Sequence, residues 1–282
     1  MTAGKSNLRA SVAARLLNRA KQTGDVYQTL LTSFCFERFL YRLGQSDVRE
    51  RFVLKGAMLL RVWSDQPYRA TRDLDLLRMG DGSFEAIRAE DEYAGTRATL
   101  PARCGTARLS LQIDMGHGDS VWPAPRACVY PALLDFPAPQ VLAYPREAVV
   151  AEKLEALVVL GDRNSRIKDF FDLHHLASQF EFDRETPVEA VGRTFARRRT
   201  TIPVEPPIGL TPAYWDNPSR PAQVRAFARR AGLAISGDPA RDLAGVLSAF
   251  LLPVLEDAQG GTPREGTWPA GGPWRPSKET PR

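Results

Sequence analysis

The sequence has few residues that form disulfides or bind transition metals. It contains three cysteines and three histidines, and Cys35, Cys104 and Cys128 lie far apart, without a Cys-x-x-Cys pair. An odd number of cysteines at such spacings argues against a disulfide framework or a zinc motif. We therefore expect the three cysteines to be core residues.

Long apolar runs are also missing. The longest, such as residues 148–150 and 250–254, are interrupted by charge or proline, well short of the roughly 18 residues that a membrane span requires. Near the N-terminus, Lys5, Arg9 and Arg15 interrupt the apolar residues, so a continuous signal-peptide core is absent. We expect a cytoplasmic protein that makes no contact with a membrane.

The composition is that of a globular protein with a basic balance. Of the 282 residues, 43% are hydrophobic, which is ample for one large domain or two domains of ordinary size. The formal net charge of +5 favours a polyanionic partner such as nucleic acid.

Hydrophobic spacing divides the chain into four parts. Residues 1–48 are predicted to form helices that pack on the core, residues 49–145 mix strands with helices, and residues 146–258 return to helical spacing. The tail, residues 259–282, is rich in glycine and proline, so we predict no regular structure there. Trp268 and Trp274 complicate that prediction, because indoles in a tail often dock onto the parent domain.

The stretch "TRDLDLL" (residues 71–77) brings two like charges close together. The alternation of a strand places Asp73 and Asp75 on one face and Leu74 and Leu76 on the other. Two ionised carboxylates at adjacent positions of one face repel each other and need a neutralising cation. A hard divalent ion with oxygen ligands, such as Mg²⁺ carrying the phosphates of a nucleotide, is suited to this role.

A solvated strand face is the alternative reading, with Arg69 and Arg72 as ion-pair partners. A second predicted strand, "RLSLQIDMG" (residues 108–116), favours the metal site because it carries Asp114 at the end of its polar face. If the two strands are neighbours, three carboxylates come together and can hold two metal ions for phosphoryl chemistry.

The stretch "LKGAML" (residues 54–59) suggests a phosphate site. It places Gly56 after Lys55 at the start of a predicted helix, where backbone N–H groups can approach a phosphate. The alternative for a single glycine is an ordinary turn.

Two later helices contribute cations. Lys153 lies at the border of the apolar face of the first helix, from which a lysine can reach a phosphate. On the second helix, Lys168 and Asp172 are four residues apart and share a face, with Asp169 one turn before Asp172. Ion pairing on the helix surface is the alternative for all four residues.

Together, these stretches resemble the AbiEii/AbiGii toxin family, nucleotidyltransferase-fold proteins of bacterial toxin–antitoxin and phage-defence systems. The resemblance covers most of the chain and is most specific in "YPREAVVAEKLEALVVLGDRNSRIKDFFDLHHLA" (residues 144–177). It implies an α+β protein with a nucleotidyltransferase-fold mixed sheet flanked by helices and a C-terminal helical domain. It also implies that an NTP and Mg²⁺ bind in the cleft between the two.

The resemblance further assigns roles to single residues. It implies that Asp73, Asp75 and Asp114 bind the metal and act in catalysis, together with Asp172 of the helical domain. The candidate nucleotide-binding residues are Lys55, Gly56, Ala57, Arg72, Lys153, Arg166 and Lys168.

Characterised members that resemble this chain transfer nucleotides to RNA. The resemblance therefore implies a Mg²⁺-dependent toxin that moves a nucleoside monophosphate from an NTP to RNA, the tRNA 3′ end being a known target. An AbiEi-like antitoxin is the expected protein partner.

Two differences from the family pattern leave an alternative open. Ala57 follows Gly56 where the signature usually has serine or glycine, so a hydroxyl is missing. Only 38 positions separate Asp75 from Asp114, which is room for one helix and one strand. The alternative is a degenerate, non-catalytic protein of the same fold that binds a nucleotide or nucleic acid.

Overall fold

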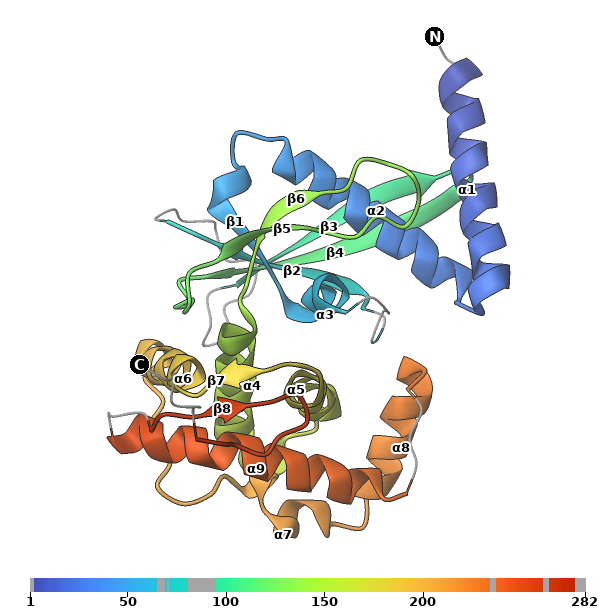
Figure 1. Ribbon diagram of the computed structural model, residues 1–282. Coiled ribbons are helices and arrows are strands. Elements are labelled where there is room, and N and C mark those ends of the chain that lie inside the picture. Colours follow the sequence, from blue (N-terminus) through green and yellow to red (C-terminus); the bar gives the residue numbers. More distant parts are fainter. Residues whose placement is uncertain are drawn as a thin grey trace. The chain divides into compact units, whose positions relative to one another are not determined.

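The computed structural model describes residues 3–64, 69, 71–80, 95–233, 237–260 and 264–276, with side chains from residue 11 onward. The chain divides into two compact units (Figure 1). Unit 1 comprises Met1–Gly118 and Pro125–Tyr144, and unit 2 comprises Asp119–Ala124 and Pro145–Arg282.

Unit 1 is built on a six-stranded mixed sheet with the strand order β3-β4-β2-β1-β6-β5 (Figure 1). β1 pairs in parallel with β6, and β2 with β4, while the other neighbouring strands are antiparallel. The strands are β1 (Phe52–Lys55), β2 (Asp73–Arg78), β3 (Gly95–Cys104), β4 (Ala107–His117), β5 (Arg126–Val129) and β6 (Gln140–Ala143). The predicted α+β class with a mixed sheet is confirmed.

Helices complete unit 1. They are α1 (Ala3–Thr23), α2 (Tyr27–Gly44), the 3₁₀ helices η1 (Arg49–Arg51) and η2 (Gly56–Met58), and α3 (Leu59–Trp63). α2 packs against β3, β4 and β6 through a buried apolar face that contains Leu31, Phe36 and Leu40. Of the helix and strand predicted between the two carboxylate strands, the strand is β3; the helix would fall on residues 81–94, outside the described residues.

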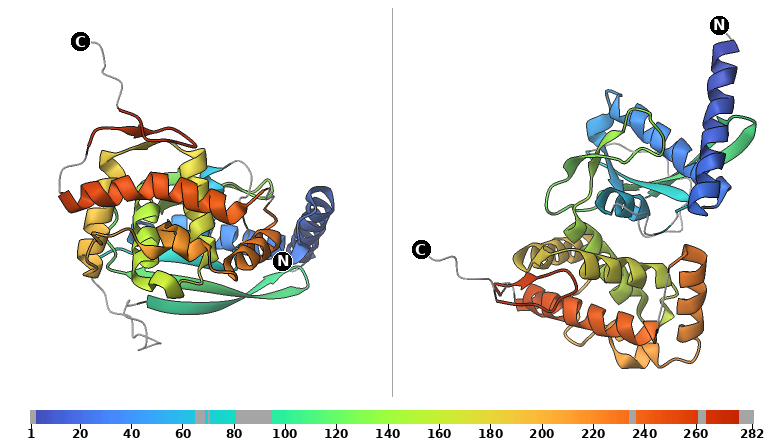
Figure 2. Two further views of the ribbon diagram at one scale, coloured as in Figure 1. Left: turned by 90° about the horizontal axis from the view of Figure 1, so that it is seen from below. Right: turned by 45° about the vertical axis from the view of Figure 1, so that its right-hand side comes forward.

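Unit 2 is mainly helical. Its elements are α4 (Arg146–Leu160), η3 (Gly161–Arg163), α5 (Ile167–Gln179), β7 (Phe182–Asp183), α6 (Glu185–Arg198), η4 (Ile208–Leu210), α7 (Pro212–Trp215), α8 (Arg220–Ala231), α9 (Pro239–Gly260) and β8 (Thr267–Trp268). α4 contacts α5 and α6, and both of these contact α9 (Figure 2). α4 begins directly after Pro145 and ends at Leu160, and the next residue, Gly161, has a φ of 53°, which suits a glycine at a helix end.

Helix α9 combines length with apolar character. Among the described residues, it is the one helix long and apolar enough to cross a membrane by those criteria alone. Its inward face includes Leu247, Phe250, Leu251 and Val254, which are completely buried inside unit 2. This burial accounts for the apolar composition, because α9 packs on α5, α6, α7 and α8 and such a helix needs a wide apolar face.

The C-terminal tail is more ordered than the sequence predicts. β8 pairs with β7, and α9 extends to Gly260, so the expectation of no regular structure for residues 259–282 was wrong for Thr267–Trp268 and for residues 259–260. Trp268 is 1% exposed, and its indole N–H donates to the carbonyl of Ala177 at 2.7 Å. The indole N–H of Trp274 donates to the carbonyl of Phe250 at 3.0 Å. The two indoles therefore dock the tail onto the helices of unit 2.

Replacing Trp268 by alanine should destabilise unit 2. The change removes a fully buried indole together with its hydrogen bond, and we expect a loss of about 3–5 kcal/mol in the free energy of unfolding. Urea denaturation followed by circular dichroism measures it. Trp122→Ala is the control, because Trp122 is 36% exposed and belongs to the same unit. Equal losses for the two variants would show that the tail does not form part of the core.

Candidate functional site

The sheet of unit 1 places a row of charged residues across four neighbouring strands. Lys55 of β1 is paired with Asp75 of β2, and Asp75 is also paired with Asp114 of β4. On the other side of Asp114, β3 contributes Arg97. Paired residues on adjacent strands lie about 5 Å apart and project from the same face. Two carboxylates are therefore held between two cations.

Asp73 adds a third carboxylate to this row. Ligand oxygens of Asp73, Asp75 and Asp114 all lie within 4.8 Å of one another, and the three residues are half-buried. On the opposite face of β2, Leu74 and Leu76 are 0% and 2% exposed, which fixes the strand in the core. The alternation of β2 and its parallel pairing with β4 thus bring together the three carboxylates expected from the sequence.

Arg97 holds one of these carboxylates. Its Nε donates to Oδ1 of Asp114 at 2.7 Å, and its Nη2 donates to Oδ2 at 2.8 Å. The hydrogen bonds to Asp114, its charge and the charges of Asp73 and Asp75 together raise the pKa of Arg97 above its ordinary value. Sequence reasoning missed Arg97, because its position opposite Asp114 depends on the register of the β3–β4 hairpin.

Gly56 lies directly against the carboxylate of Asp75. Its φ is 71°, in the left-handed region, and an added Cβ would overlap the side chain of Asp75. Glycine is therefore required both for the backbone conformation and for the close approach. Gly56 opens η2, and the helix α3 that follows has five residues.

The other predicted residues of unit 1 lie around this sheet. Lys55 places its Nζ 5.1 Å from the centre of the Tyr144 ring. Ala57 is half-buried in η2, and Arg72 is exposed just before β2. The role of these three residues in nucleotide binding stays a prediction.

In unit 2, Lys153 of α4 joins two carboxylates of α5. Its Nζ lies 2.6 Å from Oδ1 of Asp169 and 2.8 Å from Oδ2 of Asp172, and the side chain of Asp172 is 1% exposed. Burial by itself would lower the pKa of Lys153, but Asp172 and Asp169 together raise it above its ordinary value. The alternative considered from the sequence was a surface ion pair of Asp172 within its own helix. The structure instead shows a buried ion pair between α4 and α5.

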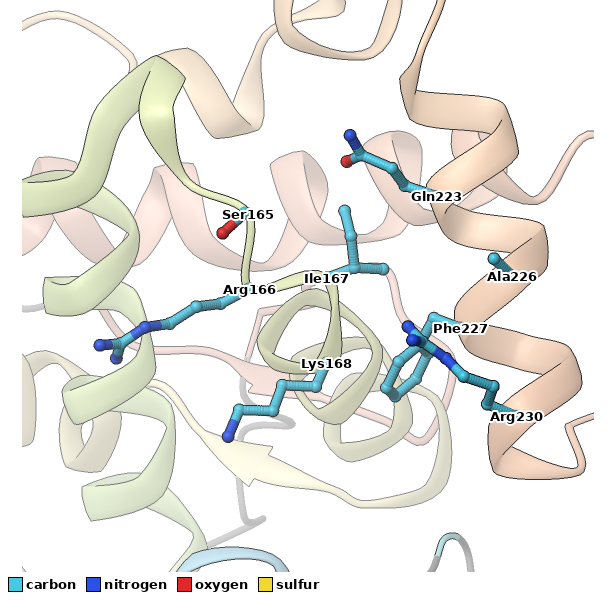
Figure 3. Close-up of a pocket in the computed structure, with 8 residues that line it drawn as sticks. All are labelled: Ser165, Arg166, Ile167, Lys168, Gln223, Ala226, Phe227 and Arg230. Carbon is cyan, nitrogen blue, oxygen red and sulfur yellow. The ribbon is translucent and has the colours of Figure 1, made fainter.

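Arg166 and Lys168 occupy the start of α5. Both are exposed and line a pocket of about 480 Å³, together with Gln223, Phe227 and Arg230 of α8. The charged ends of Arg166 and Lys168 point away from α8 (Figure 3). Neither residue belongs to the ion-pair cluster of Lys153, so the predicted cations of unit 2 lie at two separate places.

A solved structure has the same architecture. The nucleotidyltransferase toxin MenT4 from Mycobacterium tuberculosis is 19% identical, and the match covers 90% of this chain and 98% of MenT4 with a TM-score of 0.50. The fold is therefore that of the MenT nucleotidyltransferases, as the sequence predicted. JHP933 from Helicobacter pylori matches over 81% of this chain and 94% of its own, with 13% identity and a TM-score of 0.43.

A family model identifies the chain more closely than the fold. The model described as "Nucleotidyl transferase AbiEii toxin, Type IV TA system" matches residues 38–90 and 79–242, which is most of the chain. The protein belongs to this family of nucleotidyltransferase toxins from toxin–antitoxin systems, and the family predicted from the sequence is confirmed. No protein of curated function matches its sequence.

Breaking the pair made by Lys153 should destabilise unit 2. Lys153→Met leaves the buried Asp172 without its cation, so we expect a loss of about 3–5 kcal/mol in the free energy of unfolding. The pKa of Lys153 is raised above its ordinary 10.5. Its stabilising contribution is then fully present below about pH 10.5 and is lost as the pH rises through the folded-state pKa.

Urea denaturation between pH 7 and pH 10 measures the loss, which should stay constant over this range because the range lies below the ordinary pKa of lysine. Lys153→Arg keeps the charge and should lose less than Lys153→Met. Arg193→Met is the matched control, since it breaks an exposed pair with Glu189 in the same unit; it should cost no more than about 1 kcal/mol. A Lys153→Met variant as stable as this control would contradict the argument.

Proposed function

We propose that the protein is a Mg²⁺-dependent enzyme that transfers a nucleoside monophosphate from an NTP to the 3′ end of an RNA, with tRNA as the preferred acceptor. The main support for this proposal is the set of three carboxylates on β2 and β4, whose ligand oxygens lie within 4.8 Å of one another. The family supports nucleotidyl transfer as the reaction type.

The donor set fits a magnesium ion. Asp73, Asp75 and Asp114 offer carboxylate oxygens, with no histidine or cysteine among them, and hard divalent ions prefer such ligands. When bound there, Mg²⁺ would neutralise nucleotide phosphates and favour attack on them. At Gly56 an added Cβ would overlap the carboxylate of Asp75, so the glycine keeps a side chain out of the position beside this candidate ligand.

The reaction joins the RNA to the α-phosphate. The 3′-hydroxyl oxygen of the RNA forms a bond to the α-phosphorus, the bond from that phosphorus to pyrophosphate breaks, and the hydroxyl proton passes to solvent. Because most of the charge lies on phosphate oxygens, protein cations contribute chiefly by electrostatic stabilisation. We assign this role to Lys55, Arg72, Lys153, Arg166 and Lys168, and backbone N–H donation to Gly56 and Ala57.

Asp172 has a positioning role in this proposal. Its side chain is 1% exposed and lies 2.8 Å from Nζ of Lys153. A carboxylate so buried holds the lysine in place and keeps it charged. Asp169, which the sequence did not mark as a site residue, shares this role through its 2.6 Å contact with the same atom.

The biological setting follows from the family. Toxin–antitoxin membership supports an antitoxin partner, for which we propose an AbiEi-like protein, and a part in phage defence. The net charge of +5 supports RNA as the acceptor, and we propose that the protein acts in the cytoplasm.

A non-catalytic binding protein is the second candidate. Two observations favour it: Ala57 supplies no hydroxyl beside Gly56, and Arg97 already engages both oxygens of Asp114. Such a protein would bind a nucleotide or nucleic acid without turnover.

The carboxylate site should bind a divalent metal without nucleotide. We expect Mn²⁺, followed by electron paramagnetic resonance, to bind the wild-type protein, and Asp73→Asn and Asp75→Asn to weaken binding by roughly tenfold or more, because each removes a charged ligand. Asp47→Asn is the control, since Asp47 is exposed in the same unit. Similar affinities for all four proteins would rule out this metal site.

Nucleotide transfer is tested with α-³²P-labelled NTPs, Mg²⁺ and total tRNA. We expect labelled RNA from the wild-type protein, none after addition of EDTA, and roughly 10²- to 10³-fold less from Asp75→Asn, which alters charge stabilisation in the transition state. Asp47→Asn should transfer normally. Asp75→Ala should also relieve growth inhibition in cells.

Two outcomes would decide against the proposal. Label in protein rather than RNA would indicate protein nucleotidylation. Metal-dependent NTP binding by calorimetry, without labelled product for any of the four NTPs, would establish the non-catalytic alternative.

A further inference from the structure

We propose that Arg97 is an internal counter-cation that competes with the divalent metal for Asp114 and thereby weakens metal binding. The inference rests on the metal site of the proposed function and concerns a residue outside the carboxylate set. It predicts the sign of the effect that removing Arg97 has on metal affinity.

The geometry sets Asp114 apart from the other two carboxylates. Both of its oxygens accept hydrogen bonds from one guanidinium, at 2.7 and 2.8 Å. A bidentate pair of this kind is among the strong charge-assisted arrangements. A metal ion that takes Asp114 as a ligand must share these oxygens with Arg97 or displace it.

Displacement of Arg97 is feasible because the pair lies near solvent. The Arg97 side chain is 48% exposed and that of Asp114 is 27% exposed. β3 is the end strand of the six-stranded sheet, so the guanidinium can turn into water without moving a neighbouring strand. Exposed ion pairs contribute about 1 kcal/mol or less, which is small beside the attraction between a divalent ion and three carboxylates.

Repulsion among the carboxylates determines whether removing Arg97 strengthens or weakens metal binding. Without Arg97, Asp73, Asp75 and Asp114 repel one another with less compensation, so the metal-free state rises in free energy. The metal-bound state, in which the ion neutralises the carboxylates, depends less on Arg97. Removing the guanidinium should therefore tighten metal binding.

If Arg97 instead assisted metal binding, its removal would have the opposite effect on metal affinity. If its hydrogen bonds served to orient Asp114 for the metal, as partners of metal ligands often do, their removal would weaken binding. A purely structural role would leave metal affinity unchanged and lower stability equally with and without metal.

The experiment measures Mn²⁺ affinity of the full chain by calorimetry in the absence of nucleotide. We expect Arg97→Gln to lower the Kd roughly two- to fivefold, in proportion to the weak pair that it removes, with Arg97→Lys in between. Arg103→Gln is the matched control, because Arg103 lies six residues further along β3 on the same face, about 20 Å away. It makes the same change in charge and should leave the Kd unchanged.

A second comparison isolates the carboxylate. In an Asp114→Asn background, Arg97→Gln should have a smaller effect on Kd, because the competition for Asp114 is gone and only the charge of Arg97 acting on Asp73 and Asp75 remains. The rise in Tm caused by Mn²⁺ should also be larger for Arg97→Gln than for the wild-type protein, because the variant starts from a less stable metal-free state.

The outcomes separate this inference from the proposed function. Equal or weaker Mn²⁺ binding by Arg97→Gln, in a wild-type protein that does bind Mn²⁺, overturns the inference and leaves the metal site standing. An effect of the same size from Arg103→Gln, or one that persists undiminished in the Asp114→Asn background, overturns it as well. No Mn²⁺ binding by either the wild-type protein or Arg97→Gln overturns the metal site and the inference together.

Discussion

Repulsion between carboxylates is the constraint around which the sheet of unit 1 is arranged. Asp75 and Asp114 are direct partners on β2 and β4, and Asp73 lies two residues away on the same face. The fold keeps them together because the opposite face of β2 is buried and because Lys55 and Arg97 flank the pair in register. Hydrophobic burial thus supplies the free energy, and the two flanking cations reduce the electrostatic cost.

Much of this arrangement follows from local patterns in the sequence. Alternation on two strands placed the three carboxylates, because a period of two is a property of any strand. The role of Arg97 was not accessible in the same way. Its partner is set by the register of the β3–β4 hairpin. Cys104 is paired with Ala107, and the same register places Arg97 opposite Asp114. A shift of one residue would have turned Arg97 to the other face.

The cluster of Lys153 connects the stability of unit 2 with the proposed function. Sequence spacing marked Lys153 and Asp172 separately, whereas the structure joins them with Asp169 in a nearly buried cluster of two ion pairs. Replacing a buried ion pair by apolar side chains of similar volume is often neutral or stabilising. Stability alone therefore does not explain these residues, and the proposed role of Lys153 as a fixed positive charge would. Loss of activity on changing Lys153 would need a stability measurement beside it.

The glycine of the signature has a reason that does not involve a nucleotide. Gly56 is required because its backbone has a φ of 71° and passes against Asp75, and both conditions are met in this chain. Ala57, the departure from the family pattern, removes a hydroxyl but does not disturb either condition. The geometry of the carboxylate site is consequently independent of Ala57. A serine at this position would add only a hydroxyl that can donate a hydrogen bond.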